Sequence, residues 1–298
     1  MLRRSIVSAI AIAVAAAGCG RFGHASPAVT DERIVVIAQA YTEIIWALGA
    51  QDHIVAVDLS STYPPDVRSL PTVGYHRALS AEGILSMKPT LIISDGNIGP
   101  PAVVDQLKSL NIPMKTFEAK NDSIDGTKAL IREMGAFFHK APRAEELCAK
   151  LDDGMARAKT FVARFTDHPR VAVIHFGRAS NVYMMVGAPK EGDAGDAGAA
   201  GRMVEWAGGT MAVTKTGMQR MASPEIVAEA NPEVVLMTEF GYDRLNGQMD
   251  QILALPGVAT SLAAKNHRIY RVEEHQLMYF GPDTGDHVIE LAKLIHGQ

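Results

Sequence analysis

Short apolar runs alternate with short helical patterns along most of this chain of 298 residues, and this alternation limits the folds open to it. The runs RIVVIA (33–38), HIVAVD (53–58) and TLIISD (90–95) are typical of buried strands. A helical pattern near 42–49 ends at Gly49, and another covers 101–110. Strands that alternate with helices predict an α/β domain with a mostly parallel sheet.

A second series of the same kind follows a long helical stretch. Its strand-like runs are RVAVIHF (170–176), EVVLMTE (233–239) and HRIYRV (267–272), and a last helix is expected at 284–296. We therefore expect an N-terminal lobe at 31–139, a linker helix at 140–166 and a C-terminal lobe at 167–298. The predicted fold is two Rossmann-like lobes with parallel-rich sheets, joined by one long linker helix, with a ligand cleft between the lobes.

A repeated pattern supports two similar lobes. LSAEGILSMKPTLII (79–93) and ASPEIVAEANPEVVL (222–236) share three spaced residues, which pair as Ser80 with Ser223, Glu82 with Glu225 and Pro89 with Pro232. Each serine is expected to cap a helix, each glutamate to lie in its first turn, and each proline to precede a buried strand. The alternative is that any helix followed by a strand would show this pattern.

The N-terminus has the order of a secretory signal, and we assign residues 1–25 to it. Arg3 and Arg4 precede an apolar run, and small residues follow. Two processing routes are open: lipidation of Cys19 in AAGC, which lacks the usual leucine, or cleavage after GHA (23–25). Both routes place the mature protein in the periplasm, either free or anchored through Cys19.

Composition and motifs exclude several classes of function. The formal charge is −4 and no basic run is present, so nothing indicates a nucleic-acid partner. With Cys148 as the one certain mature cysteine, a disulfide framework is ruled out, and Cys148 is expected to be a buried structural thiol. An exported hydrolase using Asp58, Asp95 and His275 can be imagined, but the chain has neither GxSxG nor HExxH.

Several segments resemble one family of transport proteins. VGYHRALSAEG (73–83), within 61–93, is the most specific of them, and GPP (99–101), EWAGGTMAV (205–213) and 253–272 add to it. The chain resembles the substrate-binding proteins of ABC importers that carry haem, cobalamin or ferric siderophores, and it is most similar to the haem branch.

The resemblance implies a function without enzymatic activity. It implies binding of haem (ferric protoporphyrin IX) outside the cytoplasm and delivery to an ABC permease and its ATPase by a monomeric carrier. It also admits an outer-membrane haem receptor as a partner. A cobalamin or ferric-siderophore carrier is the alternative within the same family. A manganese or zinc carrier fits less well, because the ten histidines are scattered.

The family places its axial haem ligand where Tyr75 stands. A phenolate oxygen is a hard anionic donor that suits Fe(III), and tyrosine is an accepted haem ligand. Arg77 can strengthen the phenolate through a charge-assisted hydrogen bond. Because side chains alternate in an extended segment, Tyr75 and Arg77 should share a face. His76 should then point away as a surface histidine, with a cleft contact as the alternative.

Other candidates come from the second lobe. Arg244 is expected to meet a haem propionate, with Tyr242 as a second contact, and Met185 beside Met184 could cover the haem face. His175 is expected to be a buried, satisfied histidine.

The remaining expectations concern docking and two departures from the family. The resemblance implies that Glu82 and Glu225 pair with arginines of the permease. The Gly/Ala-rich segment 187–202 fits no phosphate loop and is longer than in relatives. Asp283 stands where relatives often have arginine, so no role of that arginine carries over.

Overall fold

The computed structural model of the chain describes residues 32–177, 182–189, 196–221 and 223–298. The strands are β1 (Ile34–Ile37), β2 (Ile54–Val57), β3 (Leu91–Ser94), β4 (Met114–Lys115), β5 (Arg170–Gly177), β6 (Val182–Val186), β7 (Thr210–Met211), β8 (Met218–Arg220), β9 (Val234–Thr238) and β10 (Ile269–Val272). The helices are α1 (Gln39–Leu48), the 3-10 helix η1 (Pro65–Ser69), α2 (Ala81–Ser86), α3 (Pro101–Ser109), α4 (Ile124–Phe137), α5 (Ala141–Val162), α6 (Asp196–Trp206), α7 (Pro224–Ala230), α8 (Glu239–Arg244), α9 (Met249–Leu253), α10 (Leu262–Lys265), α11 (Glu274–Leu277) and α12 (Thr284–His296).

The first sheet has the strand order β2-β1-β3-β4, and every pairing in it is parallel. All four residues of β1 are buried, as expected for a central strand covered on both faces. Helix α1 ends at Gly49, whose φ of 66° is the left-handed conformation that favours glycine at a helix C-terminus. β4 is only two residues long, because only Met114–Lys115 pairs with β3.

The second sheet has the order β10-β9-β5-β6-β8, and β7 pairs with β5 away from this path. β10, β9, β5 and β7 are parallel, whereas β6 is antiparallel to both β5 and β8. The sheet is therefore mixed. The fold is α/β with two lobes and parallel-rich sheets, as the alternation of strands and helices predicts.

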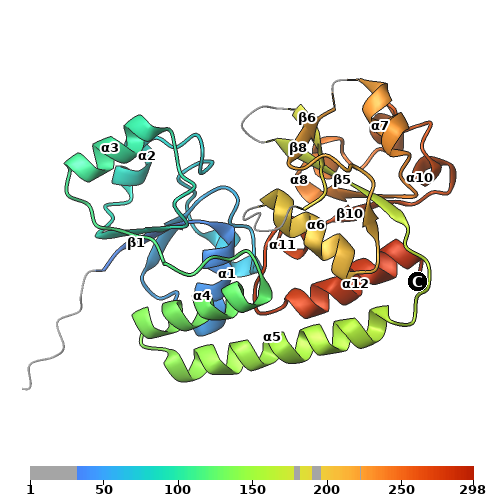
Figure 1. Cartoon of the computed structure of the whole chain (residues 1–298). Helices are drawn as coiled ribbons and strands as arrows, with labels where there is room; N and C mark the ends of the chain where they lie inside the picture. The colour runs from blue at the N-terminus through green and yellow to red at the C-terminus, as the bar shows by residue number, and fades with distance from the viewer. Residues whose placement is uncertain (1–31, 178–181, 190–195, 222) are drawn as a thin grey trace, which may run out of the picture. The chain divides into compact units, whose positions relative to one another are not determined.

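The long helix α5 lies between the two sheets in the chain and packs against α12 (Figure 1). The close approach depends on two glycines. A Cβ on Gly285 would overlap the backbone of Gly154, so these helices meet with bare backbone at that point. The last helix covers 284–296, as the sequence predicts.

The core is built from the strands and the inner faces of these helices. Ile34, Val36, Ile93 and Leu151 lie in one apolar cluster, whose members are nearly inaccessible. Cys148 belongs to the same cluster and is a free, buried thiol, as expected. In the part of the chain that the structure describes, no helix is both long and apolar enough to cross a membrane.

Candidate functional site

A cavity of about 820 Å³ lies between the two lobes. One wall comes from the N-terminal lobe, from the first turn of α1 and from loops that follow β3 and β4; the other comes from β5, β6, β8 and residues 278–280. Its volume falls in the range of roughly 300–1,000 Å³ that is usual for small-molecule and cofactor sites. The aromatic side chains that line it are Tyr41, Tyr75, Phe117, Tyr279 and Phe280.

Tyr75 and Arg77 both line this cavity, so the structure brings them together as the alternation of side chains predicts. Gly74 has a φ of 102°, a conformation that favours glycine and lets the chain turn just before Tyr75. Arg77 Nε donates to Asn97 Oδ1 at 3.3 Å, and the backbone N–H of Asn97 donates to Asp95 Oδ1 at 2.9 Å. The loop after β3 thus holds the Arg77 guanidinium at this wall of the cavity.

The prediction of a surface histidine at position 76 is wrong. His76 is only 8% exposed, and its Nδ1 lies 3.2 Å from Ser60 Oγ and 3.5 Å from Asp58 Oδ2. The His76 side chain packs over the end of β2 rather than facing solvent, and its ring lies beside that of Tyr75, with the centroids 4.3 Å apart. His76 therefore supports the loop from behind and is not among the described residues that line the cavity. Asp58 holds the same region, since its carboxylate accepts hydrogen bonds from the backbone N–H of Ser60 and from the Ser61 hydroxyl.

Charges of both signs line the N-terminal wall. Arg77 and Lys120 are cations, and Asp95 is an acid. Burial, assisted by Asp95, raises the pKa of Tyr41 to about 12, so this phenol is neutral at physiological pH. Its ring meets Phe117 edge-on, with the centroids 5.5 Å apart. Tyr41 therefore contributes apolar surface rather than a phenolate.

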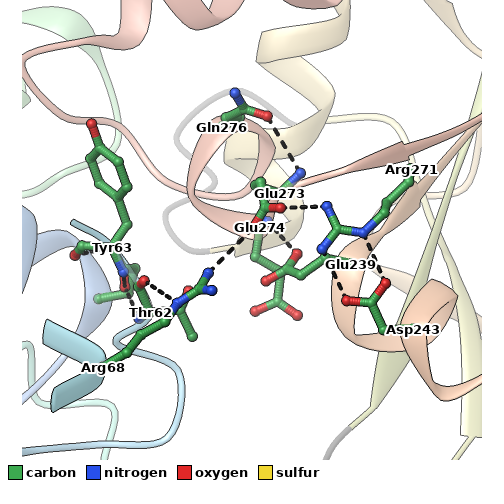
Figure 2. Close-up of polar contacts among 10 residues, drawn as sticks. Thr62, Tyr63, Arg68, Glu239, Asp243, Arg271, Glu273, Glu274 and Gln276 are labelled. Carbon is green, nitrogen blue, oxygen red and sulfur yellow. Dashed lines mark hydrogen bonds and ion pairs between the residues drawn. The ribbon is translucent and has the colours of Figure 1, made fainter. Parts of the chain in front are cut away.

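His175 lines the cavity from the C-terminal wall. Its Nδ1 lies 3.2 Å from Thr238 Oγ1 and 3.6 Å from Glu274 Oε1, so the expected hydrogen-bonded histidine is present, but at the cavity rather than wholly within the core. The backbone N–H of Glu274 donates to Glu239 Oε2 at 2.5 Å (Figure 2). Burial and the neighbouring Glu274 carboxyl raise the pKa of Glu239 to about 8.

Three residues predicted to contact a ligand lie elsewhere. Successive side chains of β6 point to opposite faces, so Met184 lines the cavity while Met185 is fully buried in the core. Tyr242 packs against the same core cluster. Arg244 is exposed, with its guanidinium 5.0 Å from the centroid of the Phe176 ring, and it is not among the described lining residues. Which face of β6 meets the cavity cannot be read from local sequence, which explains why Met184 rather than Met185 lines it.

Sequence reasoning missed several lining residues. Lys120 and Asn121 follow β4 at the carboxyl end of a parallel sheet, a position that could have marked them as ligand contacts. Tyr279 and Phe280 lie in a loop between two helices and not at the end of a strand, so their positions in the sequence do not mark them as ligand contacts. Asn121 Nδ2 donates to the carbonyl of Phe280 at 2.9 Å, which ties the two walls together.

Polar contacts also join the lobes beside the cavity (Figure 2). Arg68 on η1 pairs with Glu273 at 3.6 Å, and the Tyr63 ring stacks on His275 with centroids 3.9 Å apart and planes 5° apart. The Gln39 side chain is buried, and its Nε2 donates to the carbonyl of Tyr63 at 3.1 Å. These contacts fix the loop after β2 against the C-terminal lobe.

The two repeat glutamates are exposed in the first turns of α2 and α7. Ser80 caps α2, since its hydroxyl accepts from the backbone N–H of residue 83 at 3.4 Å. The corresponding cap is absent at Ser223, whose hydroxyl hydrogen-bonds the Glu225 carboxylate and lowers the pKa of Glu225. The prediction that both serines cap their helices is therefore right for Ser80 and wrong for Ser223.

Some expectations lie outside the described residues. These are the signal segment 1–25 with Cys19, and the part of the Gly/Ala-rich segment at 190–195. Among the residues that the structure describes, no group of three or more histidine, cysteine, aspartate and glutamate side chains is placed to hold a metal ion.

Comparison with known proteins gives one family match and several similar structures. Residues 34–275 match the family described as periplasmic binding protein. The periplasmic heme-binding protein RhuT from Roseiflexus sp. RS-1, in its apo form, is 32% identical, with a TM-score of 0.77 over 89% of this chain and 98% of that one. BhuT in complex with two hemes is 27% identical, with a TM-score of 0.73 over 89% and 98%. HutB of Vibrio cholerae, a periplasmic heme-binding protein, is 25% identical, with a TM-score of 0.70 over 90% and 100%.

The curated relatives are named for a different ligand. The vitamin B12-binding protein of Pectobacterium carotovorum is 27% identical over 128 residues, which is 43% of this chain and 46% of that protein. The corresponding protein of Pectobacterium atrosepticum is 29% identical over 114 residues, 38% of this chain and 40% of that protein. The chain thus spans less than half the length of these curated relatives.

Proposed function

Because the chain belongs to the periplasmic binding protein family, we propose that it binds ferric haem outside the cytoplasm and delivers it to the permease of an ABC importer. The observation that carries this proposal is the position of Tyr75, which lines an aromatic cavity between the lobes with Arg77 two residues away. The heme-binding proteins RhuT and BhuT, which this chain matches over most of its length, support the choice of cargo.

Tyr75 is the proposed axial ligand. A free phenol has a pKa near 10, so it needs a cation to ionise at neutral pH, and ferric iron supplies one. Arg77, held by Asn97, adds a second positive charge on the same wall. Since the cargo would leave chemically unchanged, the protein acts as a carrier rather than an enzyme in this role.

The rest of the cavity suits a flat apolar molecule with two carboxylates. Phe117, Phe280 and Met184 offer apolar and polarisable surface to the ring. Lys120 replaces Arg244 as the candidate partner for a propionate, because Lys120 lines the cavity and the described lining does not include Arg244. His175, on the opposite wall, can contact the other face of a porphyrin bound to Tyr75.

A binding titration tests the proposal. Quenching of the fluorescence of Trp46 and Trp206 by hemin should give saturable binding to the mature protein. Tyr75→Phe should weaken binding, because it removes one oxygen and keeps the ring. Tyr279→Phe is the matched control, since it removes a phenol oxygen from the other wall of the same cavity. Equal affinities for the wild type and Tyr75→Phe would overturn the assignment.

Cobalamin is the alternative cargo, favoured by the curated vitamin B12-binding relatives. The same titration with cyanocobalamin distinguishes the two. Cobalamin binding without hemin binding would replace the haem proposal, and Tyr75→Phe should then have little effect, because a corrinoid brings its own axial ligands.

Partners and location follow from the proposal. The carrier would work in the periplasm with a permease and its ATPase, and Glu82 and Glu225 would meet basic residues of the permease. An outer-membrane haem receptor would supply the cargo, and Cys19 is the proposed anchor if the chain is lipidated. We keep 31–139, 140–166 and 167–298 as the proposed boundaries of the two lobes and their linker.

A further inference from the structure

A buried carboxyl that the proposed haem site does not use lies where the two lobes meet. Glu43 on α1 is 3% exposed, and neither of its carboxyl oxygens has a hydrogen-bond partner among the described residues. A buried, unpaired carboxylate is strongly unfavourable, so such a group normally keeps its proton. The Glu43 carboxyl is therefore expected to be protonated at the junction of the lobes.

The Glu43 carboxyl packs directly against the other lobe. A Cβ on Gly281 would overlap Glu43 Oε1, so the carboxyl lies against bare backbone at Gly281. Glycine is therefore required at 281 for this contact to form.

This contact joins the two walls of the cavity. Gln39, Ala40 and Tyr41, at the start of α1, line one wall, and Glu43 lies two residues beyond Tyr41. The segment Met278–Phe280 lines the other wall and directly precedes Gly281. A change in the Glu43–Gly281 contact therefore acts on both sides of the cavity at once.

The charges around Glu43 disfavour its ionised form. Asp283, three residues from the lining segment, raises the pKa of Glu43, and Lys150 on α5 lowers it, but Lys150 is already paired with Asp283. Burial is the largest effect, and together these raise the pKa of Glu43 to about 8. The other titratable or charged groups near this junction include Tyr63, Arg68, His275, Asp286, His287 and Glu290.

We propose that Glu43 is a proton-dependent clasp between the lobes: the carboxyl holds a proton while the lobes are in contact, and separation of α1 from residues 278–283 releases that proton. Opening brings the carboxyl into water, where it ionises readily. The clasp therefore favours the closed form at low pH and loosens as the pH rises. Its effect on cargo retention, though not the clasp itself, rests on the proposed function.

The sign and size of the effect follow from linkage. Between about pH 4.5 and about pH 8 the open form binds fewer protons at Glu43 than the closed form, so the ratio of open to closed molecules rises up to tenfold per pH unit. Above about pH 8 both forms have lost the proton and the ratio levels off. Burial lowers the pKa of His275 to about 3 and also lowers that of His287, and exposure of these groups would favour opening only at acid pH.

The test uses a window in which Glu43 dominates, from about pH 6.5 to about pH 8. Spin labels at Asp105→Cys on α3 and Lys265→Cys on α10, both exposed, report the distance between the lobes of the ligand-free protein. The ratio of open to closed molecules should rise by about fifteenfold in the wild-type background over this window, because the dependence begins to level off near pH 8. Glu43→Gln, which keeps the shape without the charge, should remove the rise. Glu229→Gln, an exposed glutamate on α7, is the matched control and should keep it.

Two further arms separate the possible outcomes. Lys150→Gln should move the rise to higher pH, because it removes a nearby cation that lowers the pKa of Glu43. This variant also tests the clasp if Glu43→Gln does not fold. Hemin dissociation into apomyoglobin should accelerate over the same window in the wild type and not in Glu43→Gln. An unchanged distance profile in Glu43→Gln would overturn the clasp, whereas failure of hemin binding alone would overturn only the proposed cargo.

Discussion

Replacing Glu43 with glutamine should stabilise the folded protein, and the gain should grow with pH. The side chain is fully buried, and an amide keeps its shape without a charge. In the folded chain the pKa of Glu43 is raised from 4.5 to about 8, mainly by burial. The unfolded chain therefore binds fewer protons at this position across that window, so the free energy of unfolding of the wild type falls as the pH rises from about 4.5 to about 8.

The magnitude follows from the same values. Each pH unit inside the window costs the wild type about 1.4 kcal/mol. At pH 7 the accumulated cost is on the order of 3 kcal/mol, and near pH 5 it is under about 1 kcal/mol. Glutamine at position 43 carries no such cost, so the difference between the two proteins should widen by this slope up to about pH 8 and then level off.

Urea-induced unfolding, followed by the fluorescence of Trp46 and Trp206, measures this difference. The two proteins should be compared at intervals of one pH unit between about pH 5 and about pH 8, with Glu229→Gln as an exposed control. A difference in unfolding free energy that does not change with pH would refute the reasoning, because it would mean that Glu43 is ionised in the folded chain or that its carboxyl is not buried.

Four further substitutions test other parts of the structure. Gly285→Ala should destabilise the chain by about 1–3 kcal/mol, seen as a lower melting temperature, because its methyl group would overlap the Gly154 backbone of α5; a neutral effect would contradict this close approach. Met185→Ala should cost about 2–5 kcal/mol in urea unfolding while leaving hemin affinity unchanged, since Met185 is core; lost affinity in a folded variant would restore it to the site. Ser80→Ala should cost about 1 kcal/mol through its lost cap, and Ser223→Ala under about 0.5 kcal/mol, by the same measurement; equal costs would contradict the difference in capping.

Much of the fold follows from local patterns in the sequence. Helix 284–296 and the strands around Val35, Ile92 and Val235 have periodic apolar residues and clear end signals, and tertiary contacts reinforce those preferences. The alternation of side chains also places Tyr75 and Arg77 at one cavity. These features depend on a few neighbouring residues, which is why the sequence can predict them.

Features that depend on contacts between distant segments could not be predicted in this way. Met184 and Met185 differ only in which face of β6 they occupy, and the sequence does not say which face meets the cavity. His76 is buried because Ser60 and Asp58, which come from another part of the chain, cover it, and local sequence does not show this contact. In the sequence, Glu43 is a polar residue in a mostly apolar helix and gives no sign of a special role. Its burial against Gly281 of the other lobe becomes visible only in the structure.

The central claim is that the Tyr75 oxygen binds ferric haem iron in the cavity between the lobes. Resonance Raman spectra of the hemin complex test it most directly, because an iron-bound phenolate has vibrations of its own. The wild type and Tyr279→Phe should show the phenolate bands, and Tyr75→Phe should lack them. Phenolate bands that persist in Tyr75→Phe, or a wild-type complex without them, would contradict the claim.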